Sequence, residues 1–164
     1  MPFNMLPHIL KYFRAEKEAG LYILIIGAVV IVLSAWLWWS GNRYRAMAIP
    51  LTAFAIIELV IGSAIYLRTD KQIDTLTEHY YTDREAFALQ ETPRLEGIVS
   101  RFQIYKLIEV VLMVVGAGFI VVYRKRPALV GVGFGVVIQT AVLLGFDIMA
   151  SQRAQVYLDA LRRI

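Results

Sequence analysis

Four long apolar segments constrain this sequence more than any other feature. They cover residues 20–39, 46–67, 106–123 and 127–149, and none contains more than two charged side chains. About 20 helical residues cross the hydrocarbon core of a bilayer, where backbone groups must be hydrogen-bonded internally. A soluble protein rarely contains four helices that are each apolar on all sides. We therefore expect an all-α integral membrane four-helix bundle that forms one domain over residues 1–164.

Composition supports a membrane protein and excludes several kinds of chemistry. Charged residues make up 18% of the chain, whereas soluble domains carry about 25%. The absence of cysteine excludes thiol–disulfide exchange and thiolate metal ligation. The net charge of +4 suits the lipid bilayer and its anionic lipids, and the sequence has no nucleic-acid-binding motif. The first segment does not resemble a cleavable signal, so we expect a multi-pass protein of the plasma membrane or bacterial inner membrane.

The polar region 68–105 is predicted to be helical and not a flexible linker. Residues 82–85 (Thr-Asp-Arg-Glu) fit a capping box, and Thr92 before Pro93 fits another helix start. These signals predict a helix from the second segment to about Tyr80, then a short connecting turn or helix, and then a helix from Pro93 into the third segment. All four helices should then protrude on one face of the bilayer, with two short turns on the other.

Lysine and arginine residues give two opposing indications of orientation in the membrane. The protruding face carries the larger number of them, which places both chain termini in the cytoplasm. The short turns, residues 40–45 and 124–126, are denser in positive charge and contain no acid, which argues the reverse. We expect both termini to be cytoplasmic.

A weak internal repeat relates the two halves of the chain. The first and third segments align at an offset of 89, which matches Lys17 with Lys106. The second and fourth align at an offset of 81, which matches Glu58 with Gln139. Two tandem helical hairpins would be related by an axis along the membrane normal. The alternative is that apolar segments resemble one another by composition alone.

Glu58 is the most informative residue because it lies near the middle of the second segment. An ionised carboxylate there is costly, so we expect Glu58 to be neutral or to face water or a cation. We expect protonated Glu58 to donate a hydrogen bond to Gln139. The pair would either stabilise the contact between two helices by about 1 kcal/mol, or form a proton-binding site on a transport path. Four glycines are predicted to mark close helix packing: Gly62, Gly116, Gly131 and Gly135.

A second polar cluster is predicted at the boundary between the apolar segments and the protruding face. It is formed by Lys17, Arg68, Lys106, Glu109 and Asp147. The cluster could be a ring of ion pairs that stitches the helices together, or the mouth of an ion or solute pathway.

No metal or cofactor is expected. Asp70, Asp74 and Glu78 are spaced four residues apart, which is typical of a solvated helix face and lacks a compact cation-binding spacing. The histidines, His8 and His79, lie outside the apolar segments, which excludes haem ligation within the bundle. Hydrolase and nucleotide-binding motifs are also missing.

Three functions fit these features. The first is a non-enzymatic accessory, regulatory or interaction factor, whose protruding helices dock a protein partner or a second copy of the chain. The second is a small proton- or cation-linked transporter or channel subunit that uses Glu58. The third is a membrane enzyme that acts on lipid, with Glu109 and Asp147 as acid and base. We favour the first.

Overall fold

The computed structural model describes residues 4–163 and is all-helical over that range. Its elements are α1 (Leu6–Trp39), the 3-10 helix η1 (Arg45–Met47), α2 (Ala48–Thr82), α3 (Arg84–Val122) and α4 (Pro127–Leu161). Each long helix contains a stretch that is long and apolar enough to cross a membrane. The prediction of an all-α chain with four such helices is confirmed.

Every long helix continues beyond its apolar stretch. The helices have 34 to 39 residues, so at about 1.5 Å per residue they exceed a hydrocarbon core of about 30 Å by several turns. We call residues 20–67 and 106–149 the apolar half, and residues 4–19, 68–105 and 150–163 the polar half.

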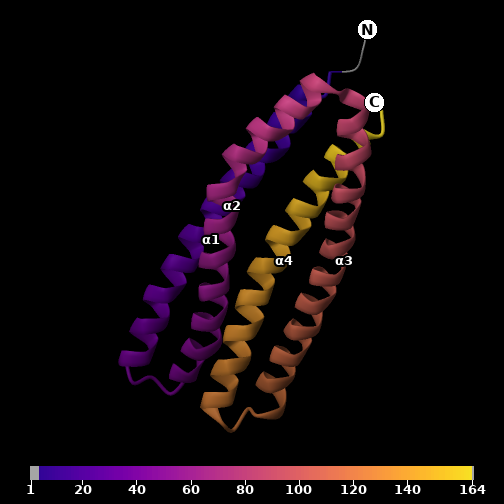
Figure 1. The fold of residues 1–164 in the computed structure, drawn as a ribbon. Coiled ribbons are helices and arrows are strands. Elements are labelled where there is room, and N and C mark those ends of the chain that lie inside the picture. The colour runs from indigo at the N-terminus through magenta and orange to yellow at the C-terminus, as the bar shows by residue number, and fades with distance from the viewer. Residues whose placement is uncertain (1–3, 164) are drawn as a thin grey trace.

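Two helical hairpins lie side by side along the molecule (Figure 1). α1 packs along α2, and α3 packs along α4. The hairpins meet mainly through α4 against η1 and α2, while α1 and α3 approach each other through side chains, where the Arg94 guanidinium lies over the Phe13 ring. The start of α1, the end of α4 and the α2–α3 connection lie at one end of the molecule, and the two short turns lie at the other (Figure 1).

One extended residue, Asp83, separates α2 from α3. Its φ of −153° interrupts the helix, and its Oδ1 accepts hydrogen bonds of 3.0 Å from the backbone N–H groups of Glu85 and Ala86. The predicted cap at Thr82 is therefore wrong. The Thr82 hydroxyl instead donates to the carbonyl of Glu78 inside α2. Aspartate is at least as good an N-cap as threonine, so the neighbouring residue takes the role.

The predicted helix start at Pro93 is also wrong, because Pro93 lies inside α3. Proline removes one backbone donor from a helix, which is tolerated best where the freed carbonyl reaches water. Pro93 is exposed in the polar half, where solvent can satisfy that carbonyl. Residues 84–92 therefore form the first turns of α3 and not a separate connection.

The two short turns follow from local residue chemistry. Gly41 has a φ of +63° and is the only residue between 4 and 163 with a positive φ, a conformation that favours glycine. Asn42 Oδ1 then accepts a hydrogen bond of 3.0 Å from the Tyr44 N–H. In the second turn, Pro127 opens α4, as predicted, where a helix needs no N–H donor.

The buried hydrophobic core lies in the polar half. At its centre Tyr12 stacks on Tyr157, with ring centroids 4.7 Å apart and ring planes at 13°. Burial raises the pKa of both tyrosines. All four helices contribute to the core, which includes Ile9, Phe13, Tyr80, Phe87, Leu95, Leu158 and Leu161.

Candidate functional site

Glu58 of α2 and Gln139 of α4 meet between the two hairpins. Both residues are 1% exposed, and Gln139 Nε2 lies 3.0 Å from Glu58 Oε1. The amide is the donor in this contact, the reverse of the expected direction. Glu58 Oε2 is buried and has no hydrogen-bond partner within residues 4–163. The contact therefore links the hairpins and leaves one carboxyl oxygen unsatisfied.

Glycines bring the backbones of each hairpin into contact. In the α1–α2 hairpin, a Cβ on Gly62 would lie 2.8 Å from the Gly20 carbonyl oxygen. In the α3–α4 hairpin, a Cβ on Gly133 would lie 2.6 Å from the Gly116 carbonyl oxygen. Neither position has room for a side chain. Gly62 and Gly116 were predicted to pack closely, whereas their partners, Gly20 and Gly133, were not.

Gly131 and Gly135 act between the hairpins. A Cβ on Gly131 would lie 2.8 Å from the Tyr44 carbonyl oxygen, and one on Gly135 would lie 2.6 Å from Pro50 Cγ. Both glycines thus let α4 approach η1 and the start of α2. They lie one and two turns before Gln139, so the same face of α4 carries the polar contact.

The charged residues predicted at the boundary fall into two separate groups. In the α1–α2 hairpin, Lys17 Nζ lies 2.6 Å from Asp70 Oδ2, and Arg68 Nη2 lies 3.2 Å from Glu16 Oε1. The hydrogen bond to Asp70 raises the pKa of Lys17. These partly exposed pairs connect α1 to α2 and reach neither helix of the other hairpin.

The second group connects α3 to α4. Lys106 Nζ lies 3.2 Å from Ser151 Oγ. Glu109 and Asp147 lie close to each other, and both lie near the charge of Lys106. The five boundary residues therefore do not form one ring among the described contacts, because each group finds its partners inside its own hairpin.

An ion pair that was not predicted, between Glu91 and Arg94, lies near the core of the polar half. Glu91 is 3% exposed. Arg94 donates to it through Nε and Nη2, with distances of 2.6 and 2.5 Å. This bidentate contact raises the pKa of Arg94. The only sequence signal is an acid–base spacing of three residues, which solvated helices also carry.

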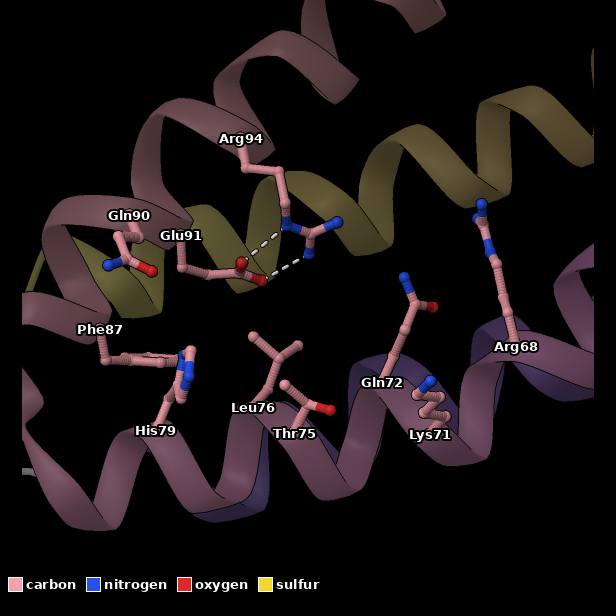
Figure 2. Close-up of a pocket in the computed structure, with 10 residues that line it drawn as sticks. All are labelled: Arg68, Lys71, Gln72, Thr75, Leu76, His79, Phe87, Gln90, Glu91 and Arg94. Atoms are coloured by element: carbon pink, nitrogen blue, oxygen red, sulfur yellow. Dashed lines mark hydrogen bonds and ion pairs between the residues drawn. The ribbon is translucent and has the colours of Figure 1, made fainter.

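A pocket of about 490 Å³ opens between α2 and α3 in the polar half (Figure 2). Arg68 and Lys71 approach it from α2, and the Glu91–Arg94 pair forms its wall on α3 (Figure 2). The remaining lining residues are Gln72, Thr75, Leu76, His79, Phe87 and Gln90.

No group of three or more His, Asp or Glu side chains that could hold a metal lies within residues 4–163. In the predicted acidic row, Asp70 is paired with Lys17.

Comparison with known proteins assigns no family to this chain. No protein-family description matches it, and no curated protein or solved structure matches it significantly.

Proposed function

We propose that this protein is a non-enzymatic, multi-pass membrane protein that works by association with another membrane protein or with a second copy of itself. The observation that carries the proposal is that Gly118 of α3 and Gly145 of α4 face open space. A methyl group at either position would meet no heavy atom within 4 Å. Neither glycine therefore has a role in packing this chain against itself.

The other helical glycines of the apolar half, which exclude Gly41 in the first short turn, are in a different situation. Each faces a neighbouring helix or turn at close range: Gly20, Gly27, Gly62, Gly116, Gly131, Gly133 and Gly135. Glycine in a helix interior costs about 1 kcal/mol relative to alanine. Lipid tails do not require it, whereas small residues mark surfaces where membrane helices approach closely.

The low burial of α3 supports the same function. In the most apolar stretch of α3, 11% of the residues are buried, against 33% in α2 and in α4. Of the four helices, α3 therefore leaves the largest share of its apolar stretch uncovered by the rest of the described chain.

A photo-crosslinking side chain on this surface tests the proposal. Val114, one turn before Gly118, is 66% exposed, and Val32 of α1 is a matched control at 68%. In native membranes we expect position 114 to crosslink to protein and position 32 to lipid. The mass of the product distinguishes a second copy from a different partner. Crosslinks to lipid alone at both positions would contradict the proposal.

Glu58 supports a second candidate function, a proton- or cation-linked transporter or channel subunit. Its unpartnered Oε2 lies at the contact between the hairpins, and intramembrane carboxyls commonly belong to proton or ion pathways. Glu58→Gln keeps the size of the side chain but cannot ionise. If transport is the function, this variant abolishes proton flux into proteoliposomes, while Glu96→Gln does not. Wild-type flux no greater than that of empty liposomes would rule this candidate out.

We assign Glu109 and Asp147 a structural role and not a catalytic one. The neighbouring Lys106–Ser151 hydrogen bond supports this, because it connects α3 to α4 beside the two carboxyls. Phospholipid turnover by the purified protein that disappears in both Glu109→Gln and Asp147→Asn would overturn this assignment.

We infer that the polar half and both termini face the cytoplasm of a plasma or inner membrane. The larger number of lysines and arginines in the polar half supports this orientation. The chain has no cysteine, so single cysteines can be introduced cleanly. An impermeant maleimide should label Arg124→Cys in intact cells and Arg163→Cys after lysis only. The opposite pattern would reverse the orientation.

We also infer that the hairpins are tandem repeats. In the first hairpin, Lys17 forms a hydrogen bond with Asp70. The matching positions in the second hairpin are Lys106, at an offset of 89, and Ser151, at an offset of 81, and these two residues also form a hydrogen bond. Glu58 and Gln139, matched at the same offset of 81, touch, as residues beside a two-fold axis would. The exchange Glu58→Gln with Gln139→Glu should then leave the free energy of unfolding almost unchanged. If the exchange lowers the free energy of unfolding by several kcal/mol, the two positions are not equivalent and the repeat is not supported.

A further inference from the structure

The pocket between α2 and α3 holds more positive than negative charge (Figure 2). Arg68 and Lys71 line it from α2 and Arg94 from α3, and Glu91 is the only carboxylate among its described lining residues. Arg94 already neutralises Glu91 through two hydrogen bonds. The two cations on α2 are therefore not balanced from within the pocket.

Several donors in the pocket are free to bind a ligand. Lys71 has no hydrogen bond or ion pair within residues 4–163. The Arg68 side chain is 56% exposed and holds Glu16 through a single contact of 3.2 Å. Arg94 uses Nε and Nη2 for Glu91 and lies over the Phe13 ring, so Nη1 is the nitrogen without a described hydrogen bond. A site in which cations outnumber carboxylates, and in which the one carboxylate is already paired, favours an anion.

The position of the pocket indicates which anions can reach it. Arg68 directly follows the apolar part of α2, and Lys71 lies almost one turn farther along the helix. With the apolar half in a bilayer, these two cations lie at the level of the lipid headgroups. The pocket then continues along α2 as far as His79, away from the bilayer and into water.

We propose that this pocket binds an anionic, phosphate-bearing ligand, with Arg68 and Lys71 holding the phosphate and Arg94 closing the site from α3. Guanidinium and ammonium groups are the usual partners of phosphate oxygens, and basic pockets between membrane helices bind anionic headgroups. A volume of about 490 Å³ accepts a headgroup or a small phosphate ester. The phosphate can come from a membrane lipid or from a soluble ester. This site is independent of the association proposed for α3.

A titration of the full chain in a neutral maltoside detergent separates the two sources. The probes are short-chain phosphatidylglycerol, short-chain phosphatidylcholine and inorganic pyrophosphate. Binding is followed by the change in intrinsic fluorescence and checked by native mass spectrometry. The variants are Arg68→Gln and Lys71→Gln, and the matched control is Lys125→Gln. Lys125 is an exposed lysine in the turn at the opposite end of the molecule.

We expect saturable binding of phosphatidylglycerol, no saturable binding of phosphatidylcholine, and affinity about five-fold weaker after loss of either pocket cation. Lys125→Gln should bind like the wild type. Saturable binding of pyrophosphate alone, with the same dependence on Arg68 and Lys71, would support the site and assign it to a soluble ester. Two results would overturn the site: no saturable binding of either anion, or equal weakening by Lys125→Gln. Lys71 has no described partner, so Lys71→Gln should retain the wild-type fold.

Discussion

The two halves of this molecule are held together by different kinds of contact. In the polar half, large side chains such as Tyr12, Phe13 and Tyr157 fill a core to which all four helices contribute. In the apolar half, glycines bring helix backbones together, and large side chains such as Trp36 and Val114 point outward. The molecule is therefore packed by side chains at one end and by backbones at the other.

The difference follows from the solvent that each half is suited to. Water drives apolar side chains together, so the polar half gains stability from a large buried core. Between helices in lipid there is no such driving force, and association depends on close packing and on polar contacts. The Glu58–Gln139 contact and the glycines of α4 match that second situation. Substitutions that act on one half alone can test this comparison.

Loss of a core aromatic in the polar half should have the largest effect. Tyr157→Ala removes a buried ring that contacts Tyr12 and Phe13. We expect the free energy of unfolding to fall by about 3–5 kcal/mol, measured by denaturant titration in mixed micelles. The adjacent Val156 is 61% exposed, so Val156→Ala should change it by less than about 0.5 kcal/mol. Equal losses for the two variants would mean that this core is not what holds the polar half together.

An added methyl group in the apolar half should have the next largest effect. Gly133→Ala places its Cβ 2.6 Å from the carbonyl oxygen of Gly116, so one backbone must shift. We expect a loss of about 1–3 kcal/mol by the same titration. Gly118→Ala is the matched control because its Cβ meets nothing within 4 Å. It should be neutral or gain up to about 1 kcal/mol. Helix propensity favours alanine at both positions, so an equal loss of stability in both variants would show that the loss does not come from the backbone contact at Gly133.

The Glu58–Gln139 hydrogen bond between the hairpins should contribute less to stability than the backbone contacts. In a double-mutant cycle of Glu58→Leu and Gln139→Leu, we expect a coupling free energy of about 0.6–1.7 kcal/mol. The control cycle pairs Glu58→Leu with Thr140→Val. The Thr140 hydroxyl bonds within α4, to the Val136 carbonyl, so this coupling should be near zero. Similar coupling in both cycles would show that the effect does not come from the hydrogen bond.

The sequence predicts the helices of this fold better than their ends. Four apolar stretches of membrane length have few alternatives to helix, and Pro127 marks the start of α4 correctly. The α2–α3 corner is harder because Thr82, Asp83 and Thr92 are all competent caps within one short region. Which of them ends a helix depends on packing between helices, and a local signal carries no information about that packing.

The polar residues of the candidate site differ in the same way. Glu58 and Gln139 can be singled out because any polar side chain is conspicuous in an apolar segment. Glu91 and Arg94 lie among many charged residues, and nothing in their spacing separates a buried pair from a solvated one. The predicted ring of five boundary residues divides because Lys17 and Arg68 find their partners on α1 and α2.

Exposed ion pairs should contribute least to the free energy of unfolding, even in the polar half, which is rich in charged residues. Arg162 Nη2 lies 2.8 Å from Glu96 Oε1 across α4 and α3, and the two side chains are 53% and 50% exposed. Water screens such a pair, so Glu96→Gln should cost less than about 0.5 kcal/mol in the same titration. Glu91→Gln breaks a buried, bidentate contact to Arg94 and should cost about 1.5–3 kcal/mol. If the two substitutions lower the free energy of unfolding equally, burial does not determine how much an ion pair stabilises the polar half. The two halves would then differ in how their helices pack, and not in how much their charged side chains contribute to stability.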